Sequence, residues 1–259
     1  MRINNNLMAL NTHRQLGVNN LNGSKNMEKL SSGFRINRAA DDAAGLSISE
    51  KMRGQIRGLN QASRNAQDGI SLIQTTEGAM DEVSNMLIRL KELAIQKANG
   101  TYNADDTANI DLEMDALIAE MSNIETNTKF NGETVLDGTT TFDIIISDSD
   151  SISLTITAGD ISTASGLANT STTGAIEAAI NDINSERATL GALQNRLEST
   201  VRNLNSTSEN LQAAESRIRD VDMAKEMMEF TKNNILQQAA TAMLAQANQA
   251  PQGVLQLLR

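Results

Sequence analysis

Residues 176–218 read IEAAINDINSERATLGALQNRLESTVRNLNSTSENLQAAESRI and carry the strongest structural signal in the chain. Ile or Leu stands at every seventh position, namely at Ile176, Ile183, Leu190, Leu197, Leu204, Leu211 and Ile218. A seven-residue apolar repeat keeps one stripe of a helix facing a partner helix. At about 1.5 Å per residue such a helix is about 60 Å long, which exceeds the usual helix of a compact domain. The repeat therefore predicts a long, paired helix.

Two other segments carry the same repeat. The first has apolar residues at Met52, Leu59, Ala66, Ile73, Met80, Leu87 and Ala94. The other has Val221, Met228, Ile235 and Ala242, with Ala224, Thr231 and Ala245 between them. Lys225 stands where the repeat that ends at Ile218 would place an apolar residue, so the buried stripe rotates there and a domain boundary is expected. The predicted fold class is mainly α, an elongated coiled-coil-like helical bundle.

The middle of the chain changes its period. A shorter helix is predicted for residues 106–124, where apolar residues keep to one side. Residues 142–146 and 152–156 then alternate apolar and polar side chains, which is the strand period of two, around a turn rich in Ser and Asp. We expect a small β-hairpin region at the tip of the bundle.

Turns and a loop surround this hairpin. Asn131-Gly132 and Asp137-Gly138 are typical turn dipeptides. Residues 158–174 are rich in Ser, Thr, Gly and Ala, and a loop is predicted there. The expected order is therefore helix, helix, small β region and helix, with the long helices of the two chain ends paired.

Composition narrows the possible functions. The 259 residues carry a net charge of −10, which disfavours nucleic acid as a partner because phosphate binding needs a basic surface. No run of apolar residues approaches the ~18 that a membrane span needs, so none is expected. Arg2 is followed by no apolar stretch, so the N-terminus does not resemble a cleaved Sec signal peptide. The protein is then either cytoplasmic or exported by a route that needs no cleaved signal.

The sequence lacks motifs for catalysis and cofactor binding. It has no cysteine and one histidine, His13, so a zinc site of the Cys/His type cannot be built and no nucleophile motif accompanies the histidine. Asp41-Asp42 is better explained as the acidic start of a helix than as a catalytic or metal-binding pair. Asp148 and Asp150 lack the distal glutamate of a calcium loop. We expect no enzyme activity, no metal and no cofactor.

Both ends of the chain are rich in apolar residues with few charges. At the N-terminus these include Ile3, Leu7 and Leu10, and at the C-terminus they include Ile235, Leu236, Leu244, Val254, Leu255, Leu257 and Leu258. Pro251 and Gly253 are expected to break the helix before the last four. One pair of helices buries too little to be stable, and extensive apolar faces usually mark an interface. The ends either pack on the main bundle or, as we favour, contact other copies of the chain.

Several long motifs resemble bacterial flagellins. The start, MRIN, and above all residues 29–48, KLSSGFRINRAADDAAGLSI, are similar to the N-terminal region of that family. Residues 211–224, LQAAESRIRDVDMA, and the tail 253–259, GVLQLLR, resemble its C-terminal region. The centre has room for only the hairpin and the loop, so the chain resembles short flagellins of the Bacillus-like Gram-positive type without outer domains.

By this resemblance the chain divides into two domains, each built from both ends of the sequence. Residues 1–42 and 219–259 would form an inner-tube terminal domain, and residues 43–175 with 176–218 would form a rod domain. The implied function is that of a structural subunit that polymerises into the bacterial flagellar filament, the propeller for swimming. A subunit that repeats one contact that is not self-complementary builds an open helix.

The resemblance also implies partners. Besides other copies in a helical homopolymer, these are a flagellar cap protein, a hook–filament junction protein, an export chaperone of the FliS type and the flagellar type III export apparatus. Export to the extracellular flagellum would need no cleaved signal peptide. Arg89, Leu93 and Glu113 match positions where the vertebrate Toll-like receptor for flagellin contacts the family. Arg89 lies outside the seam of Leu90 and Ala94, so it can face a partner.

Two alternatives remain open at the level of the sequence. A hook–filament junction protein shares the terminal helices, although residues 29–48 favour flagellin. A cytoplasmic coiled-coil adaptor would explain the heptads but not the apolar ends. Micrometre-long filaments grown from purified protein with seeds would exclude both.

Overall fold

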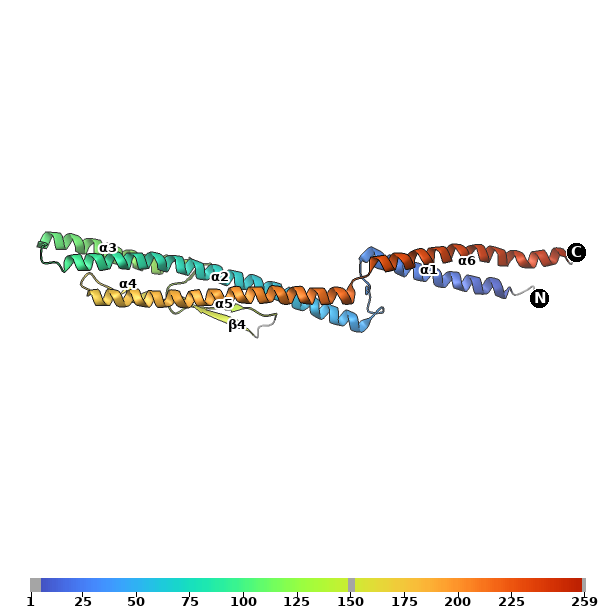
Figure 1. Cartoon of the computed structure of the whole chain (residues 1–259), viewed down its shortest axis with the longest axis horizontal. Helices are drawn as coiled ribbons and strands as arrows, with labels where there is room; N and C mark the ends of the chain where they lie inside the picture. Colours follow the sequence, from blue (N-terminus) through green and yellow to red (C-terminus); the bar gives the residue numbers. More distant parts are fainter. Residues whose placement is uncertain (1–5, 149–151, 258–259) are drawn as a thin grey trace. The chain divides into compact units, whose positions relative to one another are not determined.

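The computed structural model describes residues 6–148 and 152–257, with the backbone alone described from residue 250 onward. Most of this part of the chain is helical, which confirms a mainly α fold. The helices are α1 (Leu7–Ser32), α2 (Ala43–Lys97), α3 (Ala104–Asn127), α4 (Ser162–Ser165), α5 (Thr173–Arg219) and α6 (Met223–Leu257) (Figure 1). The strands are β1 (Lys129–Phe130), β2 (Glu133–Thr134), β3 (Thr141–Ile145) and β4 (Ser153–Thr157).

The chain divides into two compact units. The first contains residues 1–54 and 211–259, and the second contains residues 55–210. The long helices break at residues 33–42 and 220–222, next to the boundaries expected from the sequence. The boundaries between the two compact units instead fall within α2 and within α5.

In the second unit, the seven-residue stripes of α2 and α5 form the core. Ile73 and Leu87 of α2 and Ile183 and Leu197 of α5 are fully buried. The predicted stripes therefore face inward in this unit. The side chains that α3 adds to the same core are Ile110, Met114 and Met121.

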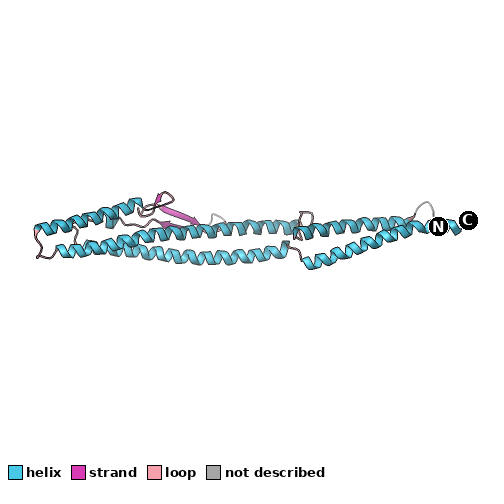
Figure 2. Ribbon diagram, turned by 90° about the horizontal axis from the view of Figure 1, so that it is seen from above, coloured by secondary structure: helices cyan, strands magenta, loops and turns pink. Residues whose placement is uncertain are grey.

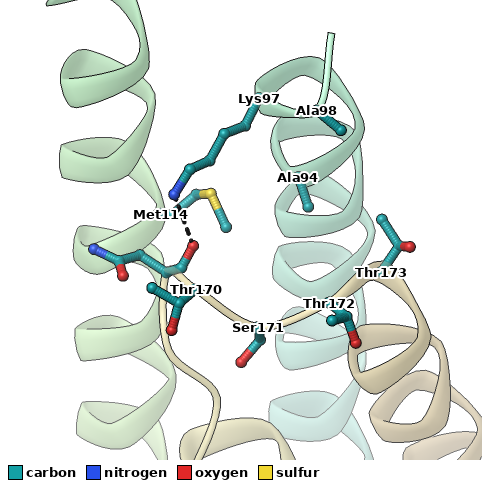
Figure 3. A pocket seen from close by; sticks show the side chains of 9 residues that line it. Ala94, Lys97, Ala98, Met114, Thr170, Ser171, Thr172 and Thr173 are labelled. Carbon is teal, nitrogen blue, oxygen red and sulfur yellow. Dashed lines mark hydrogen bonds between the residues drawn. The ribbon is translucent and has the colours of Figure 1, made fainter. Parts of the chain in front are cut away.

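Capping and one lysine fix the ends of these helices. Asn103 and Asp106 form a capping box at the start of α3, where the Asn103 side chain accepts a hydrogen bond from the Asp106 N–H at 2.7 Å. Lys97, at the end of α2, donates to the Asp111 carboxylate. It also donates to the Asn169 carbonyl oxygen, as the dashed line in Figure 3 marks. These bonds tie the loop before α5 to α2 and α3.

The β region consists of two small antiparallel pairs. Asn131 and Gly132 both have positive φ, 52° and 93°, in the turn between β1 and β2, so the predicted turn is confirmed. In the other pair, Phe142 of β3 lies opposite Ile156 of β4, as the alternating pattern predicted. The loop predicted for residues 158–174 contains the single turn of α4.

The hairpin of β3 and β4 lies along the flank of α2, so its predicted place at the tip is wrong. The Asn65 side chain donates to the Ile145 carbonyl oxygen at 3.1 Å, and a Cβ on Gly69 would lie 3.2 Å from a side-chain carbon of Ile144. From there α2 continues as far as Lys97. A lone hairpin is marginal in water, and the side chains on its inner face reach the apolar core only beside the helices.

Neither a membrane span nor a metal cluster is found in the part of the chain that the structure describes. No helix there combines the length and the hydropathy that crossing a bilayer requires. Nor do three or more His, Cys, Asp or Glu side chains gather within those ranges in a way that would hold a metal ion.

Candidate assembly surface

The turn from α1 to α2 is hydrogen-bonded to the turn from α5 to α6. Gly33 ends α1 with φ 74°, a left-handed conformation that favours glycine. The Arg35 N–H donates to the Arg219 carbonyl oxygen at 2.7 Å, and the Val221 N–H donates to the Gly33 carbonyl oxygen at 3.0 Å. Backbone hydrogen bonds therefore join the two helix breaks of the first unit.

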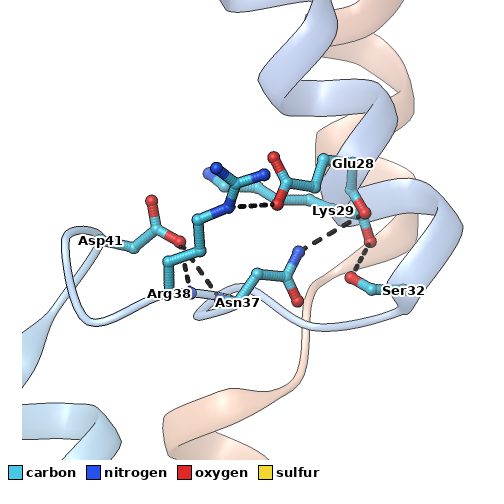
Figure 4. Close-up of polar contacts among 6 residues, drawn as sticks. All are labelled: Glu28, Lys29, Ser32, Asn37, Arg38 and Asp41. Atoms are coloured by element: carbon cyan, nitrogen blue, oxygen red, sulfur yellow. Dashed lines mark hydrogen bonds and ion pairs between the residues drawn. The ribbon is translucent and has the colours of Figure 1, made fainter.

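Asp41 and Asp42 organise the start of α2. The Asp42 carboxylate accepts from the Gly45 N–H at 2.9 Å, and a Cβ on Gly45 would collide with that carboxylate. The Asp41 carboxylate accepts from the N–H groups of Arg38 and Asn37, and these bonds hold the pKa of Asp41 below its usual value (Figure 4). The predicted role of the pair, at the start of a helix, is confirmed.

Charged side chains complete this turn. Arg38 pairs with Glu28 of α1 at 2.9 Å (Figure 4). Arg219 pairs with Glu50 of α2 at 2.7 Å and stacks over the ring of Phe34, 4.7 Å from its centroid. The hydrogen bond from Arg219 lowers the pKa of Glu50. Residues 29–48 therefore build a joint between helices, and we assign them no chemistry.

α1 and α6 lie side by side and run antiparallel (Figures 1 and 2). Between residues 9 and 27 of α1, the positions that are at least partly buried are Ala9, Thr12, Leu16, Asn19, Gly23 and Asn26. Between residues 226 and 247 of α6 they are Glu226, Phe230, Asn233, Gln237, Ala240, Leu244 and Ala247. Spacings of three and four are those of a coiled-coil seam. We call these positions the polar seam, because amide, hydroxyl and carboxylate side chains occupy many of them.

Asn26 is the centre of the polar seam near the turns. Its side chain is only 6% exposed. With the amide oriented to suit its neighbours, it donates to Glu226 at 3.1 Å and accepts from the Asn233 side chain at 3.1 Å. Lys29 lies 3.9 Å from the same Glu226 carboxylate. Hydrogen bonds and an ion pair, with little apolar burial, therefore join the two helices here.

The large apolar side chains of both helices point away from the polar seam. Leu7 is 67% exposed, and most of the other large side chains on α1 and α6 are exposed as well. We call this set the outer apolar surface; it consists of Leu7, Met8, Leu10, Val18, Leu21, Met27, Met223, Met227, Met228, Ile235, Leu236 and Met243.

The apolar repeat of α6 does not pack against a helix in the described chain: α6 pairs with α1, as expected for the terminal helices, but through its other face. Met228, Ile235 and Ala242 lie on the exposed face of α6. The polar seam runs along the opposite face of the helix, because α1 pairs with the amides and small residues there. The repeat is real, but nothing in the described chain covers it.

The other predicted assembly residues have different surroundings. Leu7, Leu10, Ile235 and Leu236 belong to the outer apolar surface, whereas Leu244 is partly buried in the polar seam. Ile3 and Leu258 lie outside the described residues, as do the side chains of Val254, Leu255 and Leu257. Sequence reasoning missed Met27, Met223, Met227 and Met243, although Met residues at helical spacing on an uncovered face were a signal.

The break expected at Pro251 and Gly253 is also wrong, since α6 continues to Leu257. A proline inside a helix removes one N–H, here the one that would bond the Ala247 carbonyl oxygen. That oxygen accepts instead from the Asn6 side chain at 2.6 Å. The lost bond is therefore replaced from the other terminal helix.

Two of the three residues expected to contact an innate receptor are exposed and joined. Arg89 on α2 forms an ion pair with Glu113 on α3 at 2.8 Å and with Glu92 at 3.1 Å. The hydrogen bonds to Glu113 and Glu92 raise the pKa of Arg89. Leu93 is only 1% exposed, so its side chain belongs to the core and offers no surface to a partner.

A unit with an apolar core, joined in sequence to a helix pair with most of its large apolar side chains exposed, is typical of a helical structural subunit, because extensive exposed apolar faces usually mark an interface. Two family models match the chain: the bacterial flagellin N-terminal helical region over residues 3–141 and the bacterial flagellin C-terminal helical region over residues 173–258. The chain belongs to the bacterial flagellin family.

Its relatives agree along the whole length. The chain is 55% identical to a flagellin of Halalkalibacterium halodurans (strain ATCC BAA-125 / DSM 18197 / FERM 7344 / JCM 9153 / C-125) and 51% identical to the flagellin of Bacillus subtilis (strain 168), with 100% of both chains covered in each case. A crystal structure of Bacillus cereus flagellin is 37% identical and covers 59% of this chain and 94% of that one, with a TM-score of 0.49. The resemblance to short flagellins of the Bacillus type is confirmed.

Membership of this family establishes the function. The chain is a structural subunit of the bacterial flagellar filament, an extracellular helical polymer used for motility, and it is not an enzyme. Full-length identity to flagellins leaves no observation in favour of the junction protein.

Proposed function

We propose that the outer apolar surface of α1 and α6 is where subunits contact one another in the filament. The observation that carries this proposal is the packing of the helix pair, in which polar side chains occupy many of the inner positions and most of the large apolar side chains are exposed. Burying one Leu or Ile side chain contributes roughly 1.5–3 kcal/mol, so the surface favours association strongly. On sequence grounds we add Ile3, Val254, Leu255, Leu257 and Leu258 to this surface, with Leu244 supporting it from the polar seam.

A single added charge tests the proposal. Ile235→Glu places a carboxylate on the outer apolar surface, opposite the polar seam. Asn234→Glu, its matched control, adds the same charge at the neighbouring exposed position. We expect Ile235→Glu to abolish seeded polymerisation, measured by sedimentation, and Asn234→Glu to retain most of it. Equal polymerisation by the two variants, with unchanged helix content by circular dichroism, would remove the outer apolar surface from the assembly contact.

The outer apolar surface also supports a role for an export chaperone of the FliS type. An exposed apolar face is an aggregation hazard before assembly, and α6 contributes four of its methionines, Met223, Met227, Met228 and Met243. Methionine adapts to grooves on a partner. Met228→Glu should weaken chaperone binding in calorimetry, whereas Met8→Glu on α1 should not. Weaker chaperone binding by Met8→Glu, with unchanged binding by Met228→Glu, would place the chaperone on α1.

We also propose export through the flagellar type III apparatus without a cleaved signal peptide, and the family membership supports this route. The cap protein and the junction protein would then meet the subunit outside the cell. Mass spectrometry of isolated filaments tests the route, because the N-terminal peptide through Arg14 should be intact. Filaments that lack this peptide would show that a leader is removed.

We further propose that Arg89 and Glu113 present a contact for the Toll-like receptor. Their exposed ion pair joins α2 and α3 at the surface of the second unit. Leu93 is buried, so its side chain would support this contact only by packing in the core beneath it.

A further inference from the structure

The Asn6 side chain forms hydrogen bonds with two helices. Its amide oxygen accepts from the Ala9 N–H at 3.1 Å and so caps the start of α1. Its amide nitrogen donates to the Ala247 carbonyl oxygen of α6 at 2.6 Å. Because Pro251 has no N–H, that carbonyl lacks its ordinary partner one turn further along the helix. The proline thus marks one place on α6 that accepts a donor from outside.

Asn26 makes the second specific contact between the same helices. It bonds to Glu226 and Asn233, as described above. Asn6 and Asn26 are twenty residues apart on α1, and their partners Ala247 and Glu226 are twenty-one residues apart on α6. Both contacts therefore belong to one antiparallel register.

Apolar packing alone does not select this register. A slip by one heptad would again bring seam positions together, since the spacing repeats every seven residues. It would, however, move Asn26 next to Ala240 in place of Asn233, and would leave the Ala247 carbonyl oxygen without Asn6. Buried polar groups without partners are strongly disfavoured. The slip would also shift the apolar side chains of α6 by about 10 Å along α1.

We propose that these contacts are two register pins: Asn6 acting at the gap left by Pro251, and Asn26 acting with Glu226 and Asn233. They align the terminal helices so that the apolar side chains of both form one continuous surface. This inference rests on the proposed assembly surface, but the test of Asn26 reads the register itself, and the test of Asn6 compares polymerisation with and without Pro251. A buried polar residue that fixes the register of a helix pair at some cost in stability is a known device of coiled coils.

Engineered cysteines report the register directly, since the chain has no cysteine of its own. In the described register residue 16 falls opposite residue 237, and after the slip that brings Asn26 next to Ala240 it falls opposite residue 244. The in-register pair is Leu16→Cys with Gln237→Cys, and the slipped pair is Leu16→Cys with Leu244→Cys. Both double-cysteine variants are made in the full-length chain and are oxidised as free subunits and as seeded filaments. We expect a disulfide from the in-register pair in filaments, and less than a tenth as much from the slipped pair.

Asn26→Leu, which removes the pin and adds apolar burial, should raise the slipped disulfide at least fivefold in the free subunit. The matched control is Asn20→Leu on the exposed face of α1, which should leave the ratio unchanged. The register role of Asn26 would be overturned if Asn26→Leu gave only the in-register disulfide, or no disulfide from either pair.

A double variant tests the other pin. Asn6→Asp keeps the oxygen that caps α1 and removes the donor for Ala247, so seeded polymerisation should fall at least fivefold. Pro251→Ala restores a backbone N–H, and in that background Asn6→Asp should lower polymerisation by less than twofold. An equal loss in both backgrounds, or failure of Pro251→Ala alone to polymerise, would overturn this pin. Neither outcome depends on the result for Ile235→Glu.

Discussion

At the scale of single residues, Asp137 shows how one carboxylate holds a turn together. It accepts from the Thr139 and Thr140 N–H groups at 3.2 and 3.0 Å, and from the Thr140 hydroxyl at 2.7 Å. Hydrogen bonds from Thr140 and Thr139 hold the pKa of Asp137 well below its usual value. Bonds that favour the charged form lower a pKa in this way, and they set the direction of β3 as it leaves the turn.

The lowered pKa predicts a pH dependence of stability. The contribution of Asp137 is fully present above its unfolded-state pKa, near 4, and is lost as the pH falls through its lower folded-state value. Asp137→Asn should therefore lower the free energy of unfolding by about 1–2 kcal/mol at pH 7 and flatten its decline in acid. Denaturant titrations from pH 7 to pH 2 measure this. Asp68→Asn, at an exposed position of α2, is the control. An equal loss of unfolding free energy in that variant would refute the role of the turn.

Arg89→Ala tests the receptor contact. Loss of a charge-assisted pair costs about a tenfold change in binding, so a reporter-cell assay should show activation weakened by about that factor. Circular dichroism should show an unchanged fold, because Arg89 is exposed. Arg64→Ala is the matched control, an exposed arginine of the same helix that bonds only to Gln61 among the described residues. Unchanged signalling by Arg89→Ala would remove this residue from the contact.

At the scale of helices, sequence patterns predicted which segments are helical better than which face is covered. The stripes through Ile73 and Ile183 were predicted to be buried, and they are, because both helices find their partners within the second unit. The stripe through Ile235 was predicted equally well as a repeat, yet it faces outward. Periodicity shows that a face needs a partner, and it does not show whether that partner belongs to the same chain.

In the candidate assembly surface, the apolar residues were predictable from the sequence, but the contacts that join α1 to α6 were not. Leu7, Leu10 and Ile235 could be chosen because large apolar residues stood among uncharged neighbours. Asn26 could not, since an Asn-rich helix gives no sign of which amide is buried. The contact between Asn6 and Ala247 depends on where a missing N–H falls against another helix, which only the three-dimensional arrangement shows.

The end of α6 carries a prediction about assembly. Deleting Val254 to Arg259 removes four large apolar side chains, each of which would contribute roughly 1.5–3 kcal/mol if buried by neighbouring subunits, less the cost of ordering them. We expect polymerisation to be lost, as measured by sedimentation of seeded filaments. A variant of full length with polar residues at these positions should fail equally.

The same deletion should leave the subunit folded. The apolar core of the second unit is drawn from residues between 66 and 197, so we expect it to form without the tail. Circular dichroism of the free subunit should therefore show a melting temperature close to that of the intact chain. Normal filament growth would make the tail a passive end, and collapse of the helix signal would assign it to the core.

At the scale of the whole molecule, the two units bury very different kinds of surface. The second has a continuous apolar core drawn from α2, α3, α5 and the strands. In the first, the polar seam joins α1 and α6, and most of the large apolar side chains of these two helices remain exposed. Most helix stability in proteins comes from packing of an apolar face, so we expect the first unit to depend on other subunits for much of its stability.

Limited proteolysis of the free subunit should reveal this difference. Trypsin is expected to remove roughly 40 residues from each end, because a helix pair with little apolar burial opens readily. A helical fragment that contains the second unit should persist. The same sites should be resistant in filaments. Full resistance of both ends in the free subunit would show that the polar seam is stable by itself.

Oxidative footprinting of methionine tests the central claim most directly, since thioethers are oxidised where solvent reaches them. Met8, Met228 and Met243 belong to the outer apolar surface, whereas Met80 and Met114 are buried in the core and serve as internal references. We expect peroxide to convert the first three to sulfoxides readily in free subunits and at least tenfold more slowly in filaments, with the references unreactive in both. Equal reactivity of Met8, Met228 and Met243 in subunits and filaments would contradict it.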